Sequence, residues 1–149
     1  MIHVESKRGR SPVAAELIER AAAAVLAHES TQGDLTIVLA GDEQLQELNR
    51  QYLGIDAPTD VLSFPASEMD PDSRTAYLGD VLISIPRAEE QAEVAGHPLE
   101  SEVQLLVVHG VLHLLGFDHA RVEQRARMWS VQGEVLDSLG LAGIRISET

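Results

Sequence analysis

Short apolar runs rich in β-branched residues alternate along the chain with segments whose apolar residues recur every three or four positions. The short runs have the length and composition of strands and cover residues 2–6, 34–40, 60–64 and 79–85. The periodic segments are typical of helices and cover residues 12–28, 43–52, 87–95, 99–115 and 122–139. This alternation, with no internal repeat and no linker, predicts one α/β domain over residues 1–149.

The segment 99–115 is the most apolar of the expected helices. In its second half the apolar run is interrupted only by His109, Gly110 and His113. A helix that is apolar on nearly every side is a buried one, so the pattern predicts a central helix surrounded by the other elements. Gly116 ends the segment, as glycine often does at a helix C-terminus.

Serine, proline and glycine mark where several elements begin and end. Ser11 followed by Pro12 predicts the start of the first helix, with Ser11 as its N-cap. The polar stretch 66–76 predicts an exposed, mobile loop between two strands.

Composition places the chain among folded, soluble proteins. Apolar residues make up 44% of the 149 residues and charged residues 23%, which excludes general disorder. The absence of cysteine excludes disulfide scaffolds, thiolate zinc sites, iron–sulfur clusters and cysteine nucleophiles. No apolar run approaches the ~18–20 residues that span a bilayer, and residues 1–8 lack the apolar core of a signal peptide. We therefore expect a cytoplasmic protein without membrane contact.

The net charge of −13 disfavours loose binding to polyanions. Ten of the 11 basic residues are nonetheless arginines, which suit bidentate contact with phosphate better than lysine does. The charge therefore argues against nonspecific nucleic-acid binding and leaves a local basic groove open.

Three of the six histidines, His109, His113 and His119, fall within eleven residues. His109 and His113 lie one turn apart on one helix face, and Gly116 lets the chain reverse so that His119 can return to the same point. Three imidazoles and one open position are the pattern of a catalytic Zn²⁺ site, although nickel, copper and iron also bind imidazole. The alternative is three unrelated histidines, but a buried helix offers few partners to an unpaired imidazole.

The remaining histidines are isolated in the sequence, and we expect surface positions for them rather than a ligand role. They are His3, His28 and His97.

The spacing H-x-x-x-H-x-x-G-x-x-H resembles that of the metzincin peptidases. In those enzymes a glutamate follows the first histidine and acts as the general base. This chain has Gly110 there, so the sequence argues against a peptidase of that mechanism.

Residues 109–119, HGVLHLLGFDH, resemble the signature H-G-x-L-H-L-x-G-x-D-H of the YbeY family at every fixed position. Residues 48–52, LNRQY, and 56–65, DAPTDVLSFP, are similar to the family's blocks L-N-x-x-Y and D-x-P-T-[DN]-V-L-S-F-P. Residues 78–81, LGDV, match its L-G-D-[IVL] block, and all blocks stand in the family's order.

The resemblance implies a bacterial zinc-dependent endoribonuclease that cuts single-stranded RNA. It implies a role in maturing the 3′ end of small-subunit ribosomal RNA and in ribosome quality control, with precursor RNA and the small ribosomal subunit as partners and no role for DNA. The implied α+β fold is a small mixed sheet of about four strands packed with helices, with one Zn²⁺ held by His109, His113 and His119 at one end of a cleft. The sequence gives no indication of the oligomeric state, and both water and the RNA 2′-OH fit as nucleophile.

Three further residues are candidates for catalysis. Asp118 could hold a histidine or a metal-bound water, with loop capping as the alternative. Ser63, on a strand that the family places beside the cleft, could contact a phosphate, with the polar face of its strand as the alternative. An arginine usually follows the family's tyrosine, where this chain has Leu53. Arg50 could stabilise phosphate charge in its place, with a solvated surface side chain as the alternative.

Two other functions compete with an endoribonuclease. Leu53 and the net charge of −13 favour a ribosome-assembly binding module with a structural zinc and little catalytic activity. A hydrolase of another substrate, such as a peptide, is the third possibility, and Gly110 argues against it.

Overall fold

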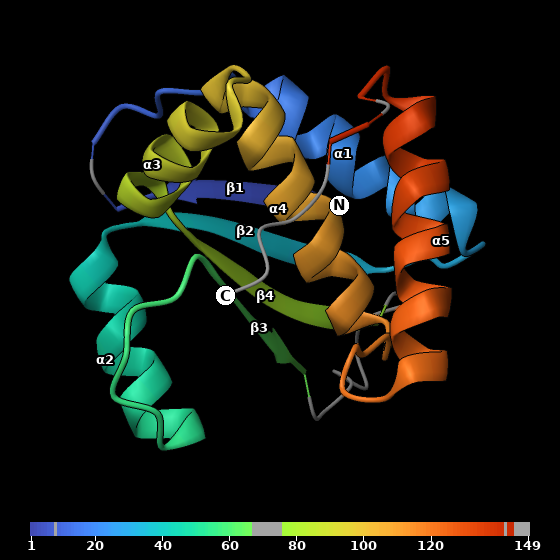
Figure 1. The fold of residues 1–149 in the computed structure, drawn as a ribbon. Helices are drawn as coiled ribbons and strands as arrows, with labels where there is room; N and C mark the ends of the chain where they lie inside the picture. Colours follow the sequence, from blue (N-terminus) through green and yellow to red (C-terminus); the bar gives the residue numbers. More distant parts are fainter. Residues whose placement is uncertain (8, 67–75, 142, 145–149) are drawn as a thin grey trace.

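The computed structural model describes residues 1–7, 9–66, 76–141 and 143–144, in which strands alternate with helices (Figure 1). The strands are β1 (Ile2–Ser6), β2 (Asp34–Ala40), β3 (Val61–Pro65) and β4 (Tyr77–Ser84). The helices are α1 (Ala15–His28), α2 (Asp42–Leu53), α3 (Ile85–Ala95), α4 (Leu99–Leu114) and α5 (Val122–Ser138). The expected loop 66–76 lies, apart from its first and last residues, outside the described residues.

The four strands form one mixed sheet in the order β1-β2-β4-β3. β1, β2 and β4 run parallel, and Ile37 in the middle of β2 pairs with Val4 on one side and Val81 on the other. β3 joins the edge antiparallel to β4. The expectation of a small mixed sheet of about four strands packed with helices is confirmed.

The two faces of the sheet are covered differently. Leu35, Ile37 and Leu39 of β2 point to the face on which α1, α4 and α5 build the main core. Because side chains alternate along a strand, Ala40 points to the other face, where Leu45 of α2 packs. Figure 1 shows α2 apart from the α4 and α5 side of the sheet.

Helix α4 is the buried centre of the molecule, as its apolar pattern predicts. Gly110 lets it approach the sheet closely, since a Cβ at this position would lie 2.5 Å from Cγ1 of Val81 and 3.2 Å from Cγ2 of Val61. The hydroxyl of Ser63 donates to the carbonyl oxygen of Gly110 at 2.9 Å. The glycine therefore sets the distance between α4 and strands β3 and β4, and the space beside it holds no larger side chain.

Two expected element ends are wrong for local reasons. Helix α1 begins at Ala15 rather than Pro12, because the Ser11 hydroxyl accepts the Val13 N–H at 3.2 Å in a turn ahead of the helix. The second difference is at the end of β4, where Ile85 begins α3 instead of ending the strand. Ser84 caps that helix by accepting the backbone N–H of Arg87 at 3.3 Å.

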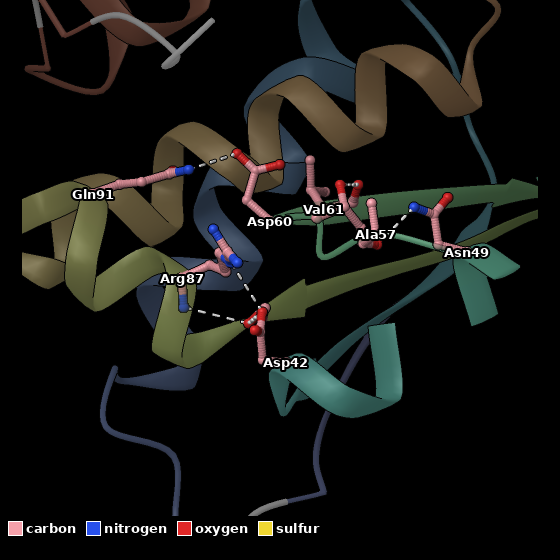
Figure 2. Close-up of polar contacts among 9 residues, drawn as sticks. Asp42, Asn49, Ala57, Asp60, Val61, Arg87 and Gln91 are labelled. Atoms are coloured by element: carbon pink, nitrogen blue, oxygen red, sulfur yellow. Dashed lines mark hydrogen bonds and ion pairs between the residues drawn. The ribbon is translucent and has the colours of Figure 1, made fainter. Parts of the chain in front are cut away.

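Polar contacts fix the segment between α2 and β3 (Figure 2). Asn49 Nδ2 donates to the Ala57 carbonyl at 3.1 Å, Arg87 Nε donates to Asp42 Oδ1 at 3.1 Å, and Gln91 Nε2 donates to Asp60 Oδ2 at 3.3 Å. These bonds connect α2, the segment that leads into β3, and α3. They place the start of β3 next to α3.

One of the three isolated histidines departs from its expected surface position. His97 lies between α3 and α4, where its Nε2 is 3.5 Å from Oε2 of Glu102, and the two side chains are 16% and 1% exposed. Burial raises the pKa of Glu102, and the neighbouring His97 opposes that rise. His3 and His28 are exposed, as expected.

Candidate metal centre

The three clustered histidines meet at the C-terminal end of α4. His109 and His113 lie on its last two turns, and the chain reverses after Leu114 through Gly116, whose φ is +96°. One nitrogen from each of His109, His113 and His119 lies within 4.8 Å of the other two. The local spacing is therefore sufficient to bring these rings to one point, and the group could hold a metal ion.

The distance between the first two rings fits a tetrahedral ion. Nε2 of His113 lies 3.2 Å from Nε2 of His109. Two imidazole nitrogens at ~2.0–2.1 Å from a tetrahedral Zn²⁺ are separated by about 3.3 Å. The donor set of three neutral nitrogens with one position left open suits zinc as well.

The surroundings keep the first two imidazoles neutral. Burial is the main reason that the pKa of His109 falls to about 3, and the nearby His113 and His119 lower it further. Burial also lowers the pKa of His113, assisted by His119. A metal ion binds the neutral ring, so at neutral pH no proton has to be displaced from these two side chains.

Helix α5 supplies two neighbours of the cluster that the sequence pattern does not single out. Oε1 of Gln132 lies 3.0 Å from Nδ1 of His109, and both residues are buried. The ring centroid of Trp129 is 5.8 Å from that of His109 and 5.4 Å from that of His119. One sequence signal points to Gln132: it is a polar residue in line with the buried Met128, one turn earlier on α5.

The other candidate residues lie at different distances from the cluster. Asp118 Oδ1 accepts the backbone N–H of His119 at 2.7 Å, which is a contact of a loop-capping aspartate beside the third histidine. Ser63 faces α4 and bonds to Gly110. Arg50 forms an ion pair with Glu47 on α2, across the sheet from the cluster. Their catalytic roles stay predictions.

Leu53 ends helix α2 and is 58% exposed. Its neighbour Tyr52 packs edge-to-face on Phe64, with 5.5 Å between ring centroids. An arginine at position 53 would therefore meet solvent at the end of α2.

The fold and the cluster define an α+β protein with a candidate three-histidine metal centre. The family model for Endoribonuclease YbeY matches residues 2–140. The chain is 43% identical over 137 residues to an Endoribonuclease YbeY of Brevibacillus brevis, covering 84% of this chain and 86% of that one. It is 39% identical over 150 residues to that of Persephonella marina, covering 99% and 98%. The chain belongs to the YbeY family.

A solved structure supports the fold. The solution structure of a Thermotoga maritima protein matches with a TM-score of 0.58 and 27% sequence identity, covering 94% of this chain and 92% of the other. Each helix within the described residues is too short or too polar to span a bilayer.

Proposed function

We propose that this protein is a zinc-dependent endoribonuclease that cuts single-stranded ribosomal RNA precursors in the cytoplasm, notably at the 3′ end of the small-subunit RNA. The observation that carries the proposal is the meeting of His109, His113 and His119 at one point, with two nitrogens at the spacing of a tetrahedral ion. Membership of a family named for endoribonuclease activity supports the choice of RNA over other substrates.

Each residue of the site has a proposed task. His109, His113 and His119 would hold the zinc ion, which would supply Lewis acidity and lower the pKa of a water molecule. Asp118 holds the backbone of His119, and so fixes the third ring relative to the other two. Ser63 keeps α4 against β3 by donating its hydroxyl hydrogen to the Gly110 carbonyl, and its proposed contact with a phosphate requires that bond to open.

The proposed contact of Arg50 with a phosphate needs one change in its surroundings. In the structure its guanidinium is paired with Glu47 on the same helix. Exposed ion pairs of this type contribute little to stability, so a phosphate can compete for the side chain.

A groove on the α2 face of the sheet, across the sheet from the metal centre, offers aromatic rings to unpaired RNA. The groove has a volume of about 580 Å³, and its lining includes Tyr52, Phe64 and Tyr77, three of the five aromatic residues of the chain. Bases stack on aromatic rings with little regard for sequence, and they must be unpaired to do so. Aromatic residues make up only 3% of the chain, and three of the five gather here.

A cleavage assay on small-subunit precursor RNA tests the proposal, with the metal content of each protein determined in parallel. Wild type is expected to cut, and His113→Ala is expected to lose both activity and zinc. His28→Ala is the matched control, because His28 is exposed and pairs with Glu29 and Glu134 instead. Full activity of zinc-free wild-type protein would overturn the proposal.

Leu53→Arg in the same assay decides between catalysis and a ribosome-assembly binding module with a structural zinc. The observation that favours the module is Leu53 itself, an exposed apolar residue where the family usually has arginine. If Leu53→Arg alone cuts, the chain keeps the metal site and lacks a phosphate-stabilising group. If no variant cuts while zinc is bound, the binding module replaces the enzyme.

A further inference from the structure

Gln132 is a buried polar side chain in the apolar stripe of α5, next to Met128, Val135 and Leu136. It is 5% exposed, as is His109, and the two side chains meet at 3.0 Å. Burying an amide costs free energy unless it is hydrogen-bonded. The partner of its oxygen is a ring of the candidate metal centre, so the role of Gln132 depends on what it does to that ring.

The contact determines which nitrogen of His109 carries the proton. An amide oxygen only accepts, so Nδ1 of His109 must donate to it. A neutral imidazole has one N–H, which leaves the lone pair of Nε2 free on the side of His113, 3.2 Å away. With the amide reversed, its NH₂ would donate to Nδ1 and the proton would sit on Nε2, where it would block a ligand bond.

We infer that Gln132 is a positioning residue of the metal centre, which holds His109 in the tautomer and ring orientation that present Nε2 to a divalent cation. The inference rests on the proposed function in one respect, namely that His109 binds the metal. Partners of this type that fix a ligating histidine typically change metal affinity by about 10–100-fold when they are replaced. Helix α5, which contributes no ligand, thereby controls the affinity of the site.

Zinc titration of the metal-free, full-length protein tests this inference, with affinity measured by competition against a chromophoric chelator. The emission of Trp129, the single tryptophan of the chain, reports that the zinc enters this site, because its ring lies 5.4 Å from that of His119. Gln132→Met keeps the length of the side chain and removes the acceptor, and it is expected to bind zinc about 10–100-fold more weakly. Gln132→Glu keeps an acceptor for the same N–H and is expected to bind at least as tightly as wild type.

Gln104→Met is the matched control. Gln104 is 7% exposed on α4, and its amide donates to the backbone carbonyl of Glu100 at 3.0 Å rather than to a histidine. Its replacement removes a buried glutamine hydrogen bond in the same way, and the zinc affinity is expected to stay at the wild-type value. Wild-type affinity in Gln132→Met, or equal loss in Gln132→Met and Gln132→Glu, would overturn the inference.

A second measurement needs no variant and so does not depend on the folding of Gln132→Met. Nitrogen-15 NMR of the histidine rings in zinc-free wild type is expected to show His109 protonated at Nδ1 and free at Nε2. The opposite tautomer would contradict the positioning role even if zinc binds. Absence of zinc binding in wild type is a different outcome, because it would refute the proposed function before any variant is compared.

Discussion

Replacing Gly110 with alanine tests how closely α4 packs on the sheet. In an exposed helix the change would be favourable, because alanine is ~0.5–1 kcal/mol better than glycine in a helix interior. Here the new Cβ would lie 2.5 Å from Cγ1 of Val81 and 3.3 Å from Oγ of Ser63. Both neighbours belong to strands of the sheet, so relief requires movement of α4 or of a strand.

The magnitude follows from two opposing effects. Overpacking of a well-filled core costs ~1–3 kcal/mol. A mid-range overpacking cost of ~2 kcal/mol, less the ~0.5–1 kcal/mol gain in helix propensity, leaves an expected loss of about 1–1.5 kcal/mol in the free energy of unfolding. At ~2–4 °C per kcal/mol for a chain of this size, Tm should fall by roughly 2–6 °C.

Gly133→Ala on α5 is the matched control, because a Cβ there meets nothing within 4 Å. It should raise the free energy of unfolding by ~0.5–1 kcal/mol. Urea unfolding and thermal melts, recorded with a chelator so that metal binding does not contribute, give both values. If Gly110→Ala is as stable as wild type while Gly133→Ala behaves as expected, the close-packing argument is wrong.

Three further predictions concern other parts of the molecule. His97→Ala leaves the carboxylate of Glu102 buried without its partner, so it should lower the free energy of unfolding in urea by about 3 kcal/mol. The double variant His97→Ala/Glu102→Gln should recover most of this loss. An equal loss in both proteins would contradict the prediction. Burial raises the pKa of Asp60 above its ordinary value of 3.8, so stability should fall as pH rises from that value through the raised one. Asp60→Asn should remove this slope in unfolding curves taken across the range, and an unchanged slope would refute the assignment. Tyr52 is 66% exposed, and Tyr52→Ala should weaken the binding of single-stranded RNA by ~1–3 kcal/mol. Anisotropy titrations on a His113→Ala background measure this affinity, and the exposed control Val94→Ala should leave it unchanged.

Local patterns predict the parts of this fold that depend on neighbours in sequence. The four strands, the buried helix α4 and the meeting of His109, His113 and His119 all follow from periodicity or spacing within short segments. The predicted start of α1 is wrong because Ser11 bonds within a turn before the helix. The sequence does not distinguish this hydrogen-bond pattern from a helix N-cap.

The parts that sequence reasoning misses depend on tertiary neighbours. Gln132 matters because α5 places it against His109, 23 positions earlier. A polar residue one turn after the buried Met128 is the one local signal, and it does not identify His109 as the partner. His97 differs from the other isolated histidines only because Glu102 is buried beside it. The order β1-β2-β4-β3 likewise follows from how the elements pack, which hydrophobic periodicity does not encode.

All three candidate ligands come from eleven consecutive residues, and this has a consequence for how zinc and folding are coupled. Closing so short a loop costs little entropy, so an unfolded chain can still bring its imidazoles to one ion. Binding to the unfolded chain subtracts from the stabilisation that zinc gives the native state. Gln132 lies outside the segment and reaches His109 only in the folded protein. Under the role proposed for it, Gln132 would add to the preference of zinc for the native chain.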